Sequence, residues 1–224
     1  MSTLGTRRFA SREALDAALA ARLGQSIGAS GPTALMLSGG TTPLAAYRRL
    51  ADSPPPHDAR LRVLFSDERY VPADSPASNY HQSQPVLDAL ALPAASLLRV
   101  RTELPLEVAA ADYGKQLRAL LEAGVPVTLG LLGLGADGHT ASLFNPADLV
   151  RARGRLAIAV QRPDGMSAVS VTPDFLIRIE RLLFVVAGAG KDDARRAFAA
   201  QDPNLIAWRA VQNCPSVELW FSLD

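Results

Sequence analysis

Residues 131–144, LLGLGADGHTASLF, form a glycine-rich segment around a histidine. Gly133, Gly135 and Gly138 have the spacing of the G-x-G-x-x-G turn that binds the pyrophosphate of dinucleotides. That turn needs a full amphipathic helix after it, but Pro146 limits any helix here to about two turns, because proline disfavours helical geometry in the residue before it. The apolar run that follows also ends without a clear acidic residue. We therefore expect no dinucleotide site.

The same segment carries the best candidate for a general base. Histidine titrates near neutrality, as a general base requires. Of the three histidines in the chain, His57 lies in a proline-rich stretch and His81 follows a charged segment. His139, beside Asp137, is the predicted base, and the alternative is a histidine that only ties down the loop. No second histidine or cysteine stands at ligand spacing, so we expect no metal.

The stretch SGGTTP forms a second candidate site after a short apolar run. Two glycines allow a tight turn and a close approach to a ligand, and a threonine cap followed by proline starts a helix. Free backbone N–H groups at such a start bind phosphate or a developing oxyanion. A plain strand-to-helix turn is the alternative. We predict substrate contacts from Ser38, Gly39, Gly40, Thr41 and Thr42, and from Gly138 of the histidine segment.

Charged residues follow two further apolar runs. In SDERYV, Arg69 could grip a phosphate through its planar fork and Asp67 could orient an imidazole. In GAGK, Lys191 is one of only two lysines in the chain and could hold a phosphate as a point charge. GAGK is not a Walker A loop, because Val185 and Asp192 stand where Gly and Ser or Thr are needed. The alternatives are a local surface ion pair and a solvated lysine.

Apolar runs that alternate with helix-period segments must position these four loops. This alternation predicts the α/β fold class: a three-layer, Rossmann-like, mostly parallel sheet with helices on both faces. Ligands bind such sheets at the carboxyl ends of the strands, where the four loops should meet. We expect strands at 33–38, 61–66, 127–133, 156–160, 168–172, 182–188 and 217–221, and helices at 12–23, from 43, at 79–90 with an interruption at Pro85, at 106–121, 173–179 and 191–200.

Composition limits the possible functions. The chain has 224 residues, of which 48% are hydrophobic and 20% charged, as expected for a globular protein of one domain. A formal net charge of +1 provides no strong field for nucleic acid or an anionic membrane. The single cysteine, Cys214, excludes an internal disulfide. No signal peptide or membrane-spanning run is apparent, so we expect a cytoplasmic protein, with neither nucleic acid nor membrane as partner.

The four loops together resemble the 6-phosphogluconolactonase family in order and spacing over nearly the whole chain. The matching pieces are SGGTTP, SDERYVP with the later Ser78-Asn79-Tyr80, GLGADGHTASLF and GAGK. The resemblance implies one family domain over residues 1–224, with the fold of glucosamine-6-phosphate deaminases and ribose-5-phosphate isomerases. It also implies hydrolysis of 6-phospho-D-glucono-1,5-lactone to 6-phosphogluconate in the oxidative pentose phosphate pathway, with no cofactor or metal.

The resemblance also assigns residues. It makes His139 the general base, places Arg69 and Lys191 on the substrate phosphate, and matches Asp67 to the family's aspartate. Two departures stand out: Ala168 occupies a position where the family usually carries arginine, and LFNP replaces the more usual LFPG.

A lactone is an activated ester, so its hydrolysis needs a base for water, donors for the carbonyl oxygen and an anchor for the substrate. We expect His139 to activate water, with Asp67, or else Asp137, orienting its ring. Backbone N–H groups of the glycine loops are candidates for the oxyanion site. Ser142 lacks the G-x-S-x-G context of a nucleophile, so no covalent intermediate is expected.

Two other functions remain open from the sequence. An amino-sugar-phosphate isomerase or deaminase would need a second carboxylate soon after the histidine, and the next acid here is Asp148. A non-catalytic sugar-phosphate-binding protein of the regulator type usually carries a DNA-binding motif, for which the first helix leaves no room. The expected partner is a small sugar phosphate lactone, bound by a monomer or weak dimer.

Overall fold

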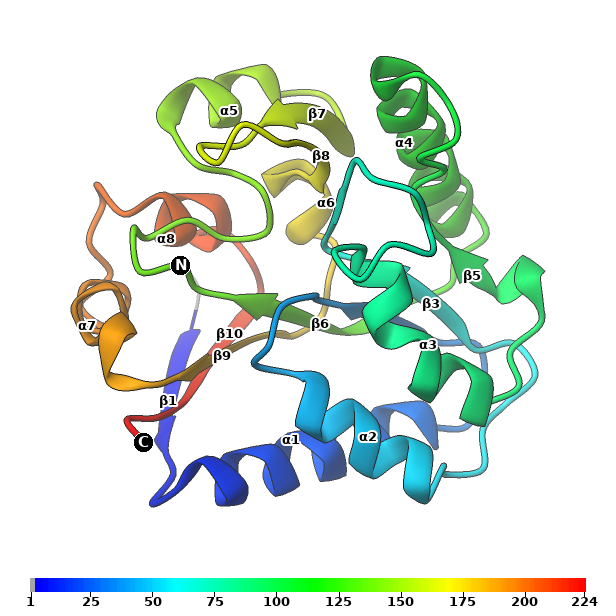
Figure 1. Ribbon diagram of the computed structural model, residues 1–224, viewed down its shortest axis with the longest axis horizontal. Coiled ribbons are helices and arrows are strands. Elements are labelled where there is room, and N and C mark those ends of the chain that lie inside the picture. The colour runs from blue at the N-terminus through cyan, green and yellow to red at the C-terminus, as the bar shows by residue number, and fades with distance from the viewer. Residues whose placement is uncertain (1–2) are drawn as a thin grey trace.

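The computed structural model describes residues 3–224, and a parallel sheet runs through its centre (Figure 1). Among these residues, seven strands are hydrogen-bonded side by side, and every neighbouring pair is parallel. Their spatial order is β1 (Thr3–Arg8), β10 (Ser216–Ser222), β9 (Leu182–Ala187), β6 (Val127–Gly133), β2 (Ala34–Leu37), β3 (Arg62–Phe65) and β5 (Leu97–Leu98).

The strands are apolar on both faces because helices cover both sides of the sheet. On β2, Leu35 and Leu37 enter one core, whereas Ala34 and Met36 enter the other. The first core contains α1 (Arg12–Ile27), α2 (Leu44–Asp52) and α3 (Asn79–Ala89), which lie below the sheet in Figure 1. The second contains α4 (Leu106–Glu122), α6 (Pro173–Leu176), α7 (Asp192–Ala199) and α8 (Ile206–Val211). The predicted three-layer α/β fold is thus confirmed.

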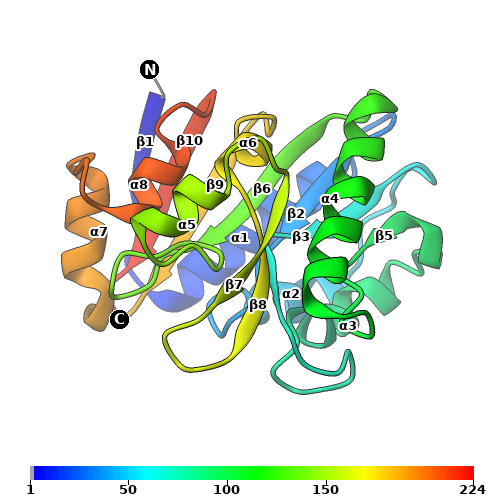
Figure 2. The ribbon, with the colours of Figure 1, turned by 90° about the horizontal axis from the view of Figure 1, so that it is seen from above.

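A second, antiparallel sheet corrects one prediction. The runs expected at 156–160 and 168–172 as strands of the main sheet form β7 (Ala157–Gln161) and β8 (Ser167–Val171), which pair with each other. The short connection between them cannot make a parallel crossover, which takes a dozen or more residues. The expected charged loop is itself a strand, β4 (Asp67–Arg69), on the other side of β8. The β7–β8 hairpin lies between α4 and α5 (Pro146–Arg151), as Figure 2 shows.

Short elements complete the chain. Single turns of 3-10 helix, η1 (Ala94–Ser96) and η2 (Ala189–Lys191), precede β5 and α7. The helix α3 is continuous through Pro85, where we expected an interruption.

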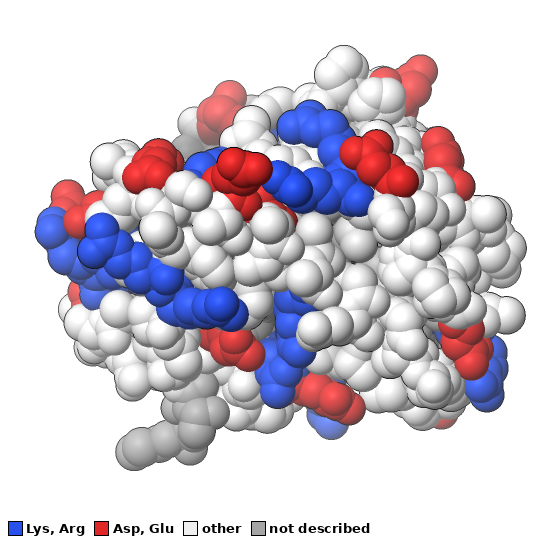
Figure 3. Space-filling view, turned by 90° about the horizontal axis from the view of Figure 1, so that it is seen from below, with Lys and Arg blue, Asp and Glu red and all other residues white. Residues whose placement is uncertain are grey.

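Basic and acidic side chains are interspersed on the face seen from below in Figure 3, consistent with the net charge of +1. Over residues 3–224, the helices are too short or too polar to cross a bilayer.

Candidate active site

A cavity of about 370 Å³ opens at the carboxyl ends of the central strands. It lies where the strand order reverses: from β2 the chain continues outward to β3 and β5, and from β6 it continues the other way to β9 and β10. Such a switch point is where open α/β sheets bind ligands. Of the predicted site residues, the cavity brings together His139, Asp67, Arg69, Lys191, Ser38, Gly39, Gly40, Thr41 and Thr42.

Gly138 has a different place from the one predicted. It has φ +84°, which favours glycine, and its carbonyl accepts a hydrogen bond from the Ala207 N–H. A Cβ at this position would lie 2.4 Å from the Leu205 side chain. Gly138 is not among the described residues that line the cavity. Its role is to let the turn pack against Leu205.

The backbone of the histidine turn is closed on itself. The N–H of Gly135 donates to the carbonyl of His139 at 2.9 Å, and the N–H of Gly138 donates to the carbonyl of Gly135 at 3.0 Å. The hydroxyl of Thr140 donates to the carbonyl of Gly133. A dinucleotide turn offers such N–H groups to a pyrophosphate, and here two of them are already used within the turn.

The imidazole of His139 is held by a carboxylate from its own turn. Its Nδ1 lies 2.5 Å from Asp137 Oδ1, and its ring centroid lies 4.5 Å from that of Phe144. Partial burial raises the pKa of Asp137, but the hydrogen bond and charge of His139 outweigh it, so the pKa lies below its usual value. With Nδ1 engaged, Nε2 is the ring nitrogen available to the cavity.

Asp67 makes different contacts from those expected. Its buried carboxylate accepts hydrogen bonds from the hydroxyls of Ser66 and Ser142, both at 2.7 Å. Its carbonyl accepts one from the Asn79 side chain at 2.8 Å. Asp67 therefore joins β4 to the histidine segment and to α3, whereas the carboxylate that contacts the imidazole is that of Asp137.

Glu68, the middle charged residue of SDERYV, is buried and structural. Its carboxylate accepts hydrogen bonds from the N–H groups of Arg69, Asn79 and Tyr80 and from the Ser78 hydroxyl, at the start of α3. Negative charge is favourable at a helix N-terminus. Burial nevertheless raises the pKa of Glu68, partly offset by those hydrogen bonds.

Two cations line the cavity, and they follow strands that lie on either side of the β6–β2 pair. Arg69 is the last residue of β4, the short strand that comes after β3. Its Nη1 donates to the carbonyl of Ala77 at 2.9 Å. Lys191 ends η2 after β9. Burial and the positive charge of Arg12 lower the pKa of Lys191, and the negative charge of Asp137 opposes them.

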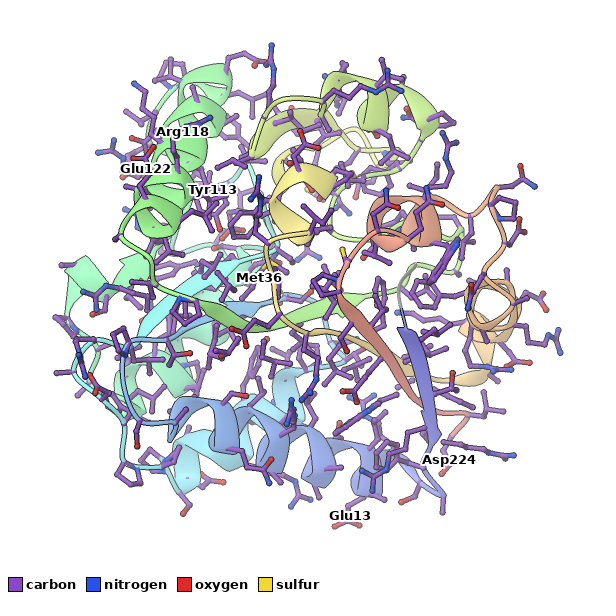
Figure 4. The ribbon with its side chains drawn as sticks, turned by 180° about the vertical axis from the view of Figure 1, so that it is seen from behind. Glu13, Met36, Tyr113, Arg118, Glu122 and Asp224 are labelled. Atoms are coloured by element: carbon purple, nitrogen blue, oxygen red, sulfur yellow. The ribbon has the colours of Figure 1, made fainter. Side chains whose placement is uncertain are left out.

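Two buried tyrosines hold the strand ends that lead into the site. The Tyr47 hydroxyl of α2 donates to the carbonyl of Ser38 at 2.7 Å and accepts from its N–H at 3.2 Å. The Tyr113 hydroxyl of α4 does the same for Phe65, at 2.5 and 3.0 Å. Figure 4 shows Tyr113 projecting from α4 toward the sheet, where Met36 lies. Each loop that follows thus starts from a fixed peptide group.

Among the polar residues at the site, Arg162, Asn79 and Arg12 were not predicted from the sequence. Arg162 and Asn79 line the cavity, and Arg12 donates from Nη2 to the carbonyl of Thr42 at 2.7 Å. Arg162 directly follows the β7 segment, and its position at the end of an apolar run was the one available signal. Arg12 lies on α1, remote in sequence from the loop that it supports, and nothing in its local sequence indicates the contact.

Known proteins resemble this chain over most of its length. Residues 8–220 match the family described as glucosamine-6-phosphate isomerases/6-phosphogluconolactonase. The chain is 33% identical over 209 residues to a 6-phosphogluconolactonase of Nostoc sp., covering 91% of this chain and 86% of that protein. It is also 33% identical over 229 residues to the human 6-phosphogluconolactonase, covering 95% and 88%. The solved 6-phosphogluconolactonase from Trypanosoma brucei superimposes with a TM-score of 0.83, at 26% identity over 99% of this chain and 97% of that one. The chain therefore belongs to the glucosamine-6-phosphate isomerase/6-phosphogluconolactonase family.

Proposed function

We propose that this protein hydrolyses 6-phospho-D-glucono-1,5-lactone to 6-phosphogluconate, a step of the oxidative pentose phosphate pathway. The observation that carries the proposal is the single cavity lined by His139, Arg69 and Lys191, in which the imidazole is already paired with a carboxylate. The relatives named as 6-phosphogluconolactonases support the same substrate.

In the proposed reaction, His139 activates the attacking water. Because Nδ1 is hydrogen-bonded to Asp137, Nε2 takes the proton as water attacks the lactone carbonyl carbon. The bond from that carbon to the ring oxygen then breaks, and the imidazolium returns the proton to the leaving ring oxygen, which becomes the free hydroxyl of 6-phosphogluconate. Asp137 fixes the tautomer and stabilises the imidazolium that forms, as the carboxylate does in a catalytic triad. A positioned base of this kind contributes about 10²- to 10⁴-fold.

Negative charge grows on the lactone carbonyl oxygen as water attacks. In the SGGTTP loop the N–H of Gly40 donates to Gln82 Oε1 at 3.1 Å, so it is engaged. The N–H groups of Gly39 and Thr41 have no hydrogen-bond partner in the described part of the chain and border the cavity, which makes them our candidate donors. One such donor is worth about 3 kcal/mol in a transition state.

The substrate phosphate anchors the lactone at a distance from the reacting carbon. Arg69 and Lys191, which both line the cavity, provide the opposite charge. Binding energy from a remote, unreacting group holds the carbonyl in place for attack.

The surroundings of Ser142 support a mechanism without a covalent intermediate. Ser142 is fully buried, and its hydroxyl donates to Asp67 at 2.7 Å. A nucleophile needs a nearby base and access to the substrate. The contacts of Ser142 instead join the histidine segment to β4.

The second candidate, amino-sugar-phosphate isomerisation or deamination, is disfavoured by the place of Asp148. This acid, the first after His139, is buried and accepts hydrogen bonds from the N–H groups of Phe144 and Asn145 at the start of α5. It also pairs with Arg151 at 2.8 Å. Asp148 is therefore committed to capping α5 rather than to moving protons on a substrate.

An assay on freshly generated 6-phosphogluconolactone tests the proposal, with the spontaneous opening of the lactone subtracted. We expect enzyme-dependent hydrolysis and no ammonia release from glucosamine 6-phosphate. Ammonia release would favour the deaminase. Tight binding of 6-phosphogluconate without turnover would favour a non-catalytic sugar-phosphate-binding protein.

A further inference from the structure

Arg162 enters the same cavity from the small antiparallel sheet. It follows β7 at the hairpin that leads to β8, and its N–H donates to the carbonyl of Met166 at 2.8 Å. Its side chain is only 14% exposed, although arginine is usually found on the surface. It lines the cavity together with Arg69 and Lys191.

Strand register places Arg162 and Arg69 on one face of this sheet. Arg69 on β4 is paired with Ala168 on β8, and Ala168 is paired with Val160 on β7. Directly paired residues project to the same face, and so do residues two apart along a strand. Arg162, two residues beyond Val160, therefore shares the face of Arg69, and the small Ala168 lies between them.

The guanidinium of Arg162 is oriented before any ligand binds. Its Nη2 lies 2.9 Å from Asp164 Oδ2, and Nε also donates to that carboxylate. The group lies 5.3 Å from the centroid of the Phe144 ring, and that ring is tilted by 39° against the His139 ring. Its Nη1 makes one long contact, 3.4 Å, to the Ser142 hydroxyl. A guanidinium has five N–H donors, so donors remain for a ligand.

Arg69 also acts on the carboxylate that holds Arg162. The hydrogen bond with Arg162 lowers the pKa of Asp164, burial opposes this, and the positive charge of Arg69 adds to the lowering. The positive charges of Arg162 and Arg69 thus both act on Asp164, and both arginines line the cavity. A dianionic phosphate, with three oxygens to share, suits two planar forks of this kind.

We propose that Arg162 binds the substrate phosphate jointly with Arg69, and that Asp164 positions its guanidinium for this contact. The inference rests on the proposed lactonase function and adds a residue that determines specificity for the phosphorylated substrate.

The test compares Arg162→Met, Arg162→Lys and Asp164→Asn with the unchanged protein on 6-phosphogluconolactone and on unphosphorylated glucono-1,5-lactone. Arg162→Met should raise KM for the phosphorylated lactone by about 10- to 100-fold, because it removes charge-assisted hydrogen bonds to the phosphate. The KM for the unphosphorylated lactone should not change. Arg162→Lys should recover part of the loss, and Asp164→Asn should raise KM less than Arg162→Met.

Arg60→Met is the matched control. Arg60 pairs with Asp58, two residues away, at 2.8 Å, as Arg162 pairs with Asp164. It precedes β3 and so lies at the amino ends of the strands, whereas the cavity lies at their carboxyl ends. This variant should leave both KM values unchanged.

Two results would overturn the inference. The first is an unchanged KM for the phosphorylated lactone in Arg162→Met. The second is an equal loss of activity in Arg162→Met and Asp164→Asn on both lactones, which would mean that the two residues form only an ion pair that stabilises the hairpin. A titration of each protein with 6-phosphogluconate separates this from a failure of the proposed function. If the unchanged protein has no lactonase activity, weaker binding by Arg162→Met still supports the phosphate contact, and equal binding refutes it. Arg162→Lys provides the same comparison if Arg162→Met does not fold.

Discussion

Gly135 packs directly against the imidazole of His139. A Cβ built on Gly135 would stand 2.1 Å from His139 Nδ1 and 2.4 Å from Asp137 Oδ1. Real side chains do not approach so closely, so the paired imidazole and carboxylate can occupy this position only against a glycine. The glycine spacing that suggests a dinucleotide turn thus makes room for a catalytic pair.

Replacing Gly135 with alanine should therefore separate the imidazole from its carboxylate. We expect kcat on the phosphorylated lactone to fall by about 10²-fold, the cost of a misplacement near 1 Å. Gly114→Ala on α4 is the control, because a Cβ there would meet its nearest neighbour at an ordinary 3.8 Å and Gly114 is not among the described residues that line the cavity. Steady-state kinetics of both variants, with circular dichroism to verify folding, makes the comparison. Equal activities in the two variants would refute this role of Gly135.

The roles of the two aspartates can be separated by amide substitutions. Asp137→Asn should lower kcat by about 10²-fold or more, because it removes the charge that stabilises the imidazolium. Asp67→Asn should mainly reduce stability, by about 1–3 kcal/mol, because it disturbs buried bonds to Ser66 and Ser142. Kinetics and thermal unfolding of both proteins provide the data. The reverse pattern would mean that Asp67 orients the ring when substrate is bound.

Binding of the phosphate should weaken with rising pH, and it should do so at a lower pH than the one at which a lysine with an ordinary pKa loses its charge. Lys191 is charged below its pKa and neutral above it, and burial together with Arg12 lowers that pKa. The affinity for 6-phosphogluconate, measured by calorimetry from neutral to alkaline pH, should therefore fall before free lysine would lose its proton.

Lys191→Arg is the control for this pH dependence, because arginine stays charged throughout the range. Its binding curve should be flatter than that of the unchanged protein. An identical fall in both proteins would assign the pH dependence to another group.

Loss of the buried Tyr47 hydroxyl should lower the free energy of unfolding, because this group makes two hydrogen bonds to the backbone of Ser38. Tyr47→Phe leaves the buried N–H and carbonyl of Ser38 without their partner, which costs about 1–3 kcal/mol. In a chain of this length, each kcal/mol lowers Tm by about 2–4 °C. Tyr80→Phe is the control, since that hydroxyl makes no hydrogen bond within residues 3–224. A Tm shift in Tyr47→Phe no larger than in the control would contradict the role of the Ser38 contact.

The main sheet could be predicted because the residues of each buried strand identify it without information from the rest of the chain. A buried parallel strand must be apolar on both faces, so ALML and VTLGLLG are recognisable without knowledge of their neighbours. The strand β1, TLGTRR, was missed because it contains polar residues at the edge of the sheet. The hairpin β7–β8 was placed in the wrong sheet because an apolar run identifies a strand but not its partner.

Within the site, the loops could be predicted better than the contacts between them. The alternation of strands and helices brings SGGTTP, the histidine turn and GAGK to one edge, as expected. Whether Asp67 or Asp137 contacts His139 depends on distances of a few ångströms, which spacing along the chain does not determine. Arg162 reaches the cavity only through the pairing of β7 with β8, which the sequence did not indicate.

The most direct test of the whole account is the kcat of His139→Ala on freshly generated 6-phosphogluconolactone, corrected for spontaneous opening. We predict a fall of about 10²- to 10⁴-fold with KM nearly unchanged, because the base acts on water and the cations hold the phosphate. A kcat close to that of the unchanged protein would contradict the assignment of His139 as the base, and with it the proposed mechanism.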